Sequence, residues 1–143
     1  MTTRRGRDRG SVLMLVPAGF LIMVILGSIA FDLSLVFLRQ RQASSTAVHV
    51  ANDLATLALD VDHLRGTGEY VLDPVTAEAV AAELLADSEV ADDLVAWEVT
   101  VIDADEVEVR LVLAVDYVFA KAIPGAADGT EVTATATAVA VPG

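Results

Sequence analysis

The sequence predicts an α+β protein in which a long N-terminal transmembrane helix continues into a small domain of one further helix on a three-stranded antiparallel sheet. Three observations predict this layout. Residues 11–38 contain a single charged side chain, that of Asp32. Apolar residues then recur at three- and four-residue steps, as on one face of a helix, and alternate strictly with polar residues in the last third of the chain.

The first helix is long enough to cross a bilayer. A hydrocarbon core about 30 Å thick is spanned by roughly 20 apolar helical residues, and residues 12–31 contain no ionisable side chain. Four arginines precede them, Arg4, Arg5, Arg7 and Arg9. Because cytoplasmic flanks favour arginine and lysine, we expect a single-pass protein of the cell membrane, with a cytoplasmic N-terminus and everything after Leu38 outside.

A cleaved secretory signal and a buried helix of a soluble protein are the two alternative interpretations of this segment. The apolar region of a cleaved secretory signal is about 7–15 residues long and is followed by a small-residue cleavage site. Here the apolar region is longer, and Phe37-Leu38-Arg39-Gln40 follows it. A buried helix of a soluble protein rarely combines this length with an arginine-rich flank. A retained anchor is therefore favoured over both.

Charge and cysteine content restrict the function of the external part. Residues 39–143 carry five basic and 19 acidic side chains. Such an acidic surface repels nucleic acids and anionic lipid head groups, so we expect no nucleic-acid partner. The chain has no cysteine, which excludes disulfides, thiol catalysis and cysteine-ligated zinc.

The first helix is expected to continue beyond the membrane to about Val61, a length on the order of 75 Å. Arg65-Gly66-Thr67-Gly68 would then end this part of the chain, since glycine commonly terminates helices. The predicted division is a cytoplasmic basic tail (1–10), a transmembrane helix (11–38), its extramembrane continuation (39–65) and an external α+β region (66–143). The apolar face of the continuation comprises Ala43, Ala47, Val50, Ala51, Leu54, Leu57, Ala58 and Val61.

A second helix and three strands are predicted after residue 66. Asp73 suits the N-cap and Pro74 the first position of a helix. Period-two alternation predicts strands over residues 95–103, 106–119 and 131–141. The short connections between these strands favour antiparallel pairing. We expect the two helices to cover the apolar face of the sheet.

Several segments resemble the TadE/TadG-like proteins of the Flp (Tad) pilus-assembly system. The pattern in that family is a basic tail, Arg-Gly, an apolar helix ending in an Ala-x-Asp-like step, an arginine-rich exit and an alanine-rich helix. The resemblance covers residues 4–60 well and 107–142 loosely. The matching segments are Asp8-Arg9-Gly10-Ser11-Val12, Ile29-Ala30-Phe31-Asp32, Phe37-Leu38-Arg39-Gln40-Arg41-Gln42-Ala43 and Ala51-Asn52-Asp53-Leu54-Ala55-Thr56-Leu57-Ala58, together with the ending around Ile123-Pro124-Gly125 and Val132-Thr133-Ala134-Thr135-Ala136.

The resemblance implies a pilin-like layout and a non-enzymatic structural or assembly role in a Tad-like pilus or secretion apparatus, with other components of that apparatus as partners. It also makes Gly10 and Ser11 a candidate processing site. Family members that are processed carry Glu five residues after the cleaved glycine, whereas position 15 is Leu15. The chain is therefore closer to the unprocessed, TadG-like style, and whether it is cleaved after Gly10 is left open.

The candidate partner contacts lie within the membrane helix. Gly27, Ala30, Asp32 and Ser34 are predicted to form its contact face, through which the chain could also oligomerise. Small residues four apart allow helices to approach closely, and a carboxylate near the end of a membrane helix is costly unless it has a partner. For Asp32 two interpretations stay open: a polar contact with a partner helix, or simple exposure to water at the membrane surface.

No catalytic motif is recognisable, so we expect no enzymatic activity, no cofactor or metal and no small-molecule substrate. His49 and Asp53 would meet on one helical face, and Asp60, Asp62 and His63 cluster in sequence, but their spacing matches no metal motif. The acidic run 103–106 lacks the glycine and downstream ligands of a calcium loop. The alternative to an assembly role is a signal-anchored cell-surface binding module unrelated to pili.

Overall fold

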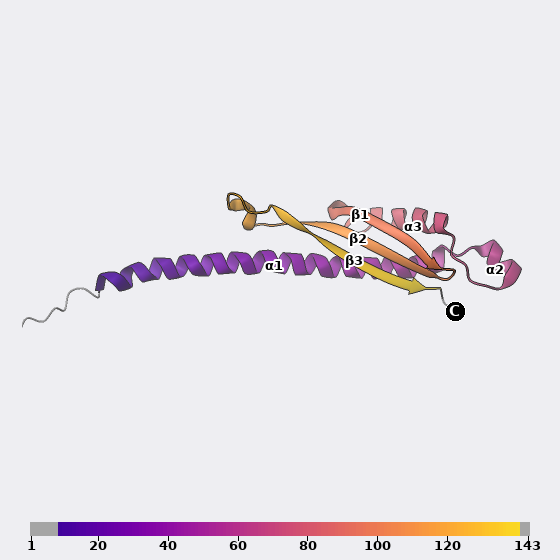
Figure 1. The fold of residues 1–143 in the computed structure, drawn as a ribbon, viewed down its shortest axis with the longest axis horizontal. Helices are drawn as coiled ribbons and strands as arrows, with labels where there is room; N and C mark the ends of the chain where they lie inside the picture. Colours follow the sequence, from indigo (N-terminus) through magenta and orange to yellow (C-terminus); the bar gives the residue numbers. More distant parts are fainter. Residues whose placement is uncertain (1–8, 141–143) are drawn as a thin grey trace, which may run out of the picture.

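The computed structural model describes residues 9–140, with side chains from Leu15 onward. One long helix runs the length of the molecule, and a small domain lies along its C-terminal half (Figure 1). The elements are α1 (Arg9–Leu57), α2 (Val61–Thr67), α3 (Pro74–Ala86), η1 (Ala91–Asp93), β1 (Leu94–Asp103), β2 (Glu106–Asp116), η2 (Ala120–Ala122) and β3 (Gly129–Val139). The predicted α+β layout is confirmed.

Helix α1 has 49 residues and continues through Pro17, which corresponds to about 74 Å of helix. The expectation that it extends to about Val61 is wrong, because it ends at Leu57. There Leu59 forms an isolated bridge with Leu72. Asp60 caps the separate helix α2 by accepting hydrogen bonds from the N–H groups of Asp62 and His63. The segment predicted as one helical continuation is therefore a helix end, a cap and a second short helix.

Helix α3 begins as its sequence predicts. The Asp73 side chain accepts hydrogen bonds from the N–H groups of Val75 and Thr76, and Pro74 occupies the first turn. The helix ends at Ala86, before the acidic segment that leads into β1. Its buried residues, Ala77, Ala81 and Leu85, lie on one side of the helix.

The three strands form an antiparallel sheet in the order β1-β2-β3. In the shared register, Leu111 of β2 lies opposite Trp97 of β1 and Ala134 of β3. The strand predicted over residues 106–119 is three residues too long, since β2 leaves the sheet at Asp116. Asp32 accounts for this difference, as described below.

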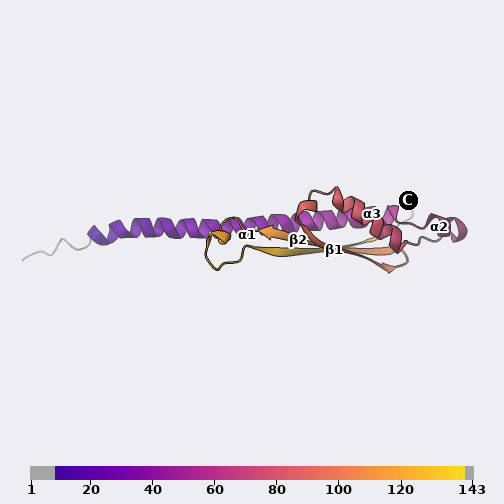
Figure 2. The same cartoon turned by 90° about the horizontal axis from the view of Figure 1, so that it is seen from above.

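The core lies between one face of the sheet and the two helices α1 and α3. Helix α1 packs across β3 and β2, and α3 packs against α1 and β1; Figure 2 shows the strands along one side of α1. Alanines are buried on both partners of the closest pairing, Ala43, Ala47 and Ala51 on α1 and Ala134 and Ala138 on β3. These small side chains allow the helix to approach the strand closely. The buried face of β2 is built from the larger side chains Val107, Val109, Leu111, Leu113 and Val115.

Candidate functional site

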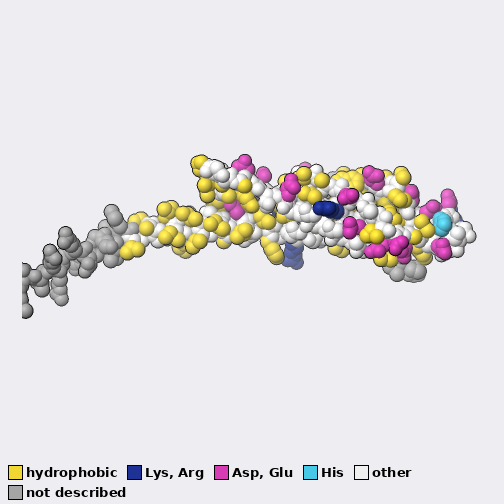
Figure 3. All heavy atoms as spheres, viewed as in Figure 1, with side chains coloured by type: hydrophobic (Ala, Val, Ile, Leu, Met, Phe, Trp, Pro, Cys, Tyr) yellow, Lys and Arg dark blue, Asp and Glu magenta, His cyan; other side chains and the backbone are white. Residues whose placement is uncertain are grey.

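Helix α1 lies in two different surroundings. From Leu15 to Phe31 all of its large apolar side chains are exposed, for example Phe20 (69%) and Met23 (72%). The most apolar window of the helix has a mean hydropathy of 2.5, with 6% of it buried. This part of α1 is long and apolar enough to span a membrane. Figure 3 shows its hydrophobic surface in yellow, while acidic side chains gather on the domain.

Asp32 lies where these two parts of the helix meet, and its own chain covers it. Only 6% of this residue is exposed. Its carboxylate accepts hydrogen bonds from the backbone N–H groups of Val118 (2.9 Å), Phe119 (3.2 Å) and Ala120 (2.9 Å). These three residues lie in the connection between β2 and β3 (residues 117–128), which we call the β2–β3 loop. The carboxylate thus binds the start of η2 as an N-cap residue binds the first turn of a helix.

This contact explains why β2 ends early. The N–H groups of residues 118–120 point at a carboxylate on α1, and hydrogen bonds to a charged acceptor are stronger than those between neutral groups. The edge-to-face contact of Phe31 and Phe119, with ring centroids 5.4 Å apart, holds the same segment against the helix. The alternation that predicted a strand up to Phe119 continues past Asp116, but the chain turns onto α1 instead.

The contact face predicted within the membrane helix is not brought together. Successive helical residues are rotated by about 100°, so Asp32 lies about 140–160° around the helix from Gly27, Ala30 and Ser34. All three of these small residues are exposed, and the Ser34 hydroxyl donates to the Ala30 carbonyl in the same helix. Both interpretations of Asp32 are corrected, because it binds its own chain. A partner contact at Gly27, Ala30 and Ser34 stays a prediction.

The candidate processing site lies at the N-terminal end of α1. Gly10 and Ser11 fall in the first turn of α1. Their side-chain surroundings lie outside the described residues.

Polar side chains also fasten the outer part of α1 to the domain. Arg39 forms an ion pair with Asp93 at 2.8 Å and donates a hydrogen bond to the Gln42 side chain. The Gln40 amide donates to the backbone carbonyl of Thr133 in β3 at 2.9 Å. These contacts begin within two turns of Asp32, so the domain is attached to the helix directly beyond the apolar segment.

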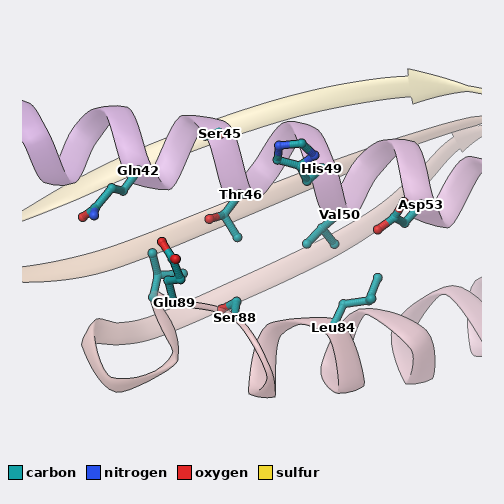
Figure 4. Close-up of a pocket in the computed structure, with 10 residues that line it drawn as sticks. Gln42, Ser45, Thr46, His49, Val50, Asp53, Leu84, Ser88 and Glu89 are labelled. Carbon is teal, nitrogen blue, oxygen red and sulfur yellow. The ribbon is translucent and has the colours of Figure 1, made fainter.

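A groove lies between α1, α3 and the segment that joins α3 to β1 (Figure 4). It has a volume of about 370 Å³, and His49 and Asp53 of α1 lie on its wall with Leu84 and Glu89 opposite. Among residues 9–140, no three His, Asp or Glu side chains are grouped closely enough to hold a metal ion. The groove is also lined by the hydroxyls of Ser45, Thr46 and Ser88, but among the described residues none of them is hydrogen-bonded to His49.

The other acidic residues singled out in the sequence have structural roles. Asp60 is the N-cap of α2, as described above. Residues Ala104 and Asp105 form the tight turn between β1 and β2, where their carbonyls accept hydrogen bonds from the N–H groups of Leu72 and Ala140. The acidic run 103–106 is therefore a turn that ties two other segments of the chain to the sheet.

The comparisons with protein-family models, curated proteins and solved structures find no match for this chain. The TadE/TadG resemblance therefore stays a prediction from the motifs.

The β2–β3 loop is the part of the site that the sequence patterns missed. A signal was present in the composition: between Asp116 and Asp128 the only charged residue is Lys121. Loops on acidic domains are usually polar, so an apolar loop pointed to a special environment. What the patterns could not show is that Asp32, 86 residues earlier, would bind it.

Proposed function

We propose that this protein is a non-enzymatic, membrane-anchored structural or assembly component of a Tad (Flp)-like pilus or secretion apparatus. In this proposal α1 crosses the cell membrane with its N-terminus in the cytoplasm, and the α+β domain lies outside. The protein works through contacts of its membrane helix and its domain with other components of the apparatus.

The observation that carries the proposal is the continuity of α1. Helix α1 exposes large apolar side chains from Leu15 to Phe31 and contributes buried residues to the core of the domain from Ala43 to Ala55. A helix that is apolar on every face is suited to lipid. Since the domain packs on this helix itself, a load on the domain is transmitted to the membrane segment, as an assembly component requires. A recognition module on a flexible linker would not need such an arrangement.

The orientation in the membrane follows from the flanking charges. Four arginines precede the apolar segment, and the domain after it is acidic. The positive-inside rule favours the end with the arginines in the cytoplasm.

The proposal is tested by purifying the tagged full chain in detergent from membranes of its native cells. We expect pilus or secretion components in the eluate, above the level found with an unrelated single-pass protein. Ala30→Leu adds bulk to the exposed small face and should reduce their recovery, whereas the matched change Ala18→Leu, at an exposed alanine elsewhere in the span, should not. If no such component is enriched, the assembly role is wrong and the alternative of a surface binding module is favoured.

The same preparation decides the processing question through its intact mass. A retained anchor gives the mass of the unprocessed chain. Cleavage after Gly10 gives the mass of residues 11–143 and would indicate a processed, pilin-type subunit.

A further inference from the structure

The β2–β3 loop turns back along the membrane helix. Val24, Ile25 and Ile29 of α1 line a cleft of about 240 Å³ together with Phe119 and Ile123 of the loop. From Phe31, the last residue of the uncharged segment, Val24 is seven residues back, which is about 10 Å along the helix. The loop therefore lies beside the outer part of the segment that is apolar enough to span a membrane, as Figures 1 and 3 show.

The surface of this loop is apolar where it is exposed. Val118 (47%), Phe119 (45%) and Ile123 (60%) present large hydrophobic side chains that the protein does not cover. Phe119 and Ile123 adjoin the exposed apolar surface of α1, including Ile25 and Ile29. Lys121 is the only charged residue between Asp116 and Asp128, and a lysine can extend its ammonium group to the head-group layer while its stem stays in an apolar environment.

The backbone of the loop is also prepared for an apolar environment, in which unpaired polar groups are costly. Asp32 binds the N–H groups of residues 118–120. Those of Ala122, Ile123 and Ala126 bind the carbonyls of Phe119, Ala120 and Ile123. The Asp32 charge is itself enclosed, with 6% of the residue exposed. Five of the six N–H groups in residues 118–124 are therefore paired, which lowers the cost of placing this segment in an apolar environment.

We propose that residues 118–124 insert into the outer leaflet of the bilayer beside α1, so that the chain meets lipid through two elements. The partner is the acyl-chain and head-group boundary of the membrane. Continuity with the apolar surface of α1 and the pairing of most N–H groups in the segment argue for lipid. The inference rests on the membrane anchoring in the proposed function, and it adds that the domain is held at a fixed height and rotation against the membrane. Asp32 acts as the positioning residue of the loop.

The test uses the absence of native cysteine. Single-cysteine versions of the full chain, Ile123→Cys, Ile102→Cys and Leu21→Cys, are reconstituted in vesicles of phosphatidylcholine and phosphatidylglycerol and reacted with a membrane-impermeant maleimide. Ile123 (60% exposed) and Ile102 (51% exposed) are matched in residue type and exposure. Both residues lie after α1 and therefore on the same side of the membrane. The ratio of their reaction rates is thus independent of how the protein is oriented in the vesicles.

We expect Ile123→Cys to react at least about tenfold more slowly than Ile102→Cys, because thiolates form and are reached poorly in apolar surroundings. Leu21→Cys should be protected as well. An environment-sensitive fluorophore at position 123 should be quenched by brominated acyl chains, whereas the same label at position 102 should not. Packing against the protein alone would not produce that quenching.

The experiment distinguishes a failure of the loop insertion from a failure of the membrane anchor. Equal reactivity of the two isoleucine positions, with Leu21→Cys protected, overturns the insertion of the loop and leaves the anchor intact. Rapid reaction at Leu21→Cys overturns the membrane anchor, and with it both this inference and the membrane part of the proposed function.

Discussion

Leu54→Ala tests whether the outer half of α1 is the core of the domain. Leu54 is fully buried on the face of α1 that packs on the sheet, while Leu57, one turn later, is 58% exposed. The two residues are of the same type in the same helix, so Leu57→Ala is the matched control. Any difference between them reports packing on the domain and not helix propensity.

The expected magnitude follows from this burial. Truncating a fully buried leucine costs about 2–5 kcal/mol of unfolding free energy, a large share of the about 5–15 kcal/mol by which a domain is stable. The exposed Leu57→Ala should change the unfolding free energy by less than about 0.5 kcal/mol. With a denaturant dependence of about 2 kcal/mol per molar urea, Leu54→Ala should lower the urea midpoint by roughly 1–2.5 M.

The assay is urea unfolding of the full chain in mild detergent, followed by tryptophan fluorescence. The chain has one tryptophan, Trp97, which lies in β1 and packs against the core without being part of α1. A shift seen at Trp97 therefore shows that the helix and the sheet unfold together. Equal midpoints for the two variants would refute the claim that α1 is integral to the domain.

Three further predictions concern the caps and the closest backbone approach. Asp32→Ala removes the acceptor for three N–H groups of the β2–β3 loop. In detergent, trypsin should therefore cleave the variant at the loop's single lysine about tenfold faster than it cleaves the unchanged chain. Equal cleavage rates would contradict the positioning role of Asp32. Hydrogen bonds from the hydroxyl and the backbone of Thr76 hold the pKa of Asp73 below its usual value. The Asp73 carboxylate therefore stabilises the folded protein fully above its unfolded pKa of about 3.9, and this contribution is lost as the pH falls through the lower folded pKa. Asp73→Asn should flatten the dependence of thermal stability on pH in that acid range and lower stability at pH 7. An unchanged pH dependence would count against the cap. Gly129→Ala places a Cβ 2.5 Å from a carbonyl oxygen of β2 and should cost about 1–3 kcal/mol. Gly66→Ala, inside α2 and with open space around it, should not lower the urea midpoint, because alanine is favoured over glycine in a helix.

The sequence predicted the secondary structure well wherever neighbouring residues alone decide it. The cap at Asp73 with Pro74 marks the start of α3, and the alternation in residues 107–115 marks β2, because both depend on neighbours in sequence. The boundaries that failed are those decided by distant residues. α1 stops at Leu57, where Leu59 pairs with Leu72.

The candidate site was predicted only in part for the same reason. Asp32 could be singled out, since a lone carboxylate next to an apolar segment is unusual. Its grouping with Gly27, Ala30 and Ser34 came from nearness in sequence, whereas helical rotation places it on another face. Its actual partners follow 86 to 88 residues later, and no periodic pattern reports such a pairing.

The sequence by itself determined that an apolar helix preceded by arginines continues into an acidic α+β domain, because hydrophobicity and periodicity are properties of neighbouring residues. The tertiary structure alone decided how the two are joined. Packing of small side chains placed β3 on α1, and the Asp32 carboxylate drew the β2–β3 loop back along the apolar segment. The contact between the loop and the helix requires the Asp32 carboxylate to meet the N–H groups of residues 118–120, which lie far from it in sequence. It therefore forms only once the sheet has packed on the helix.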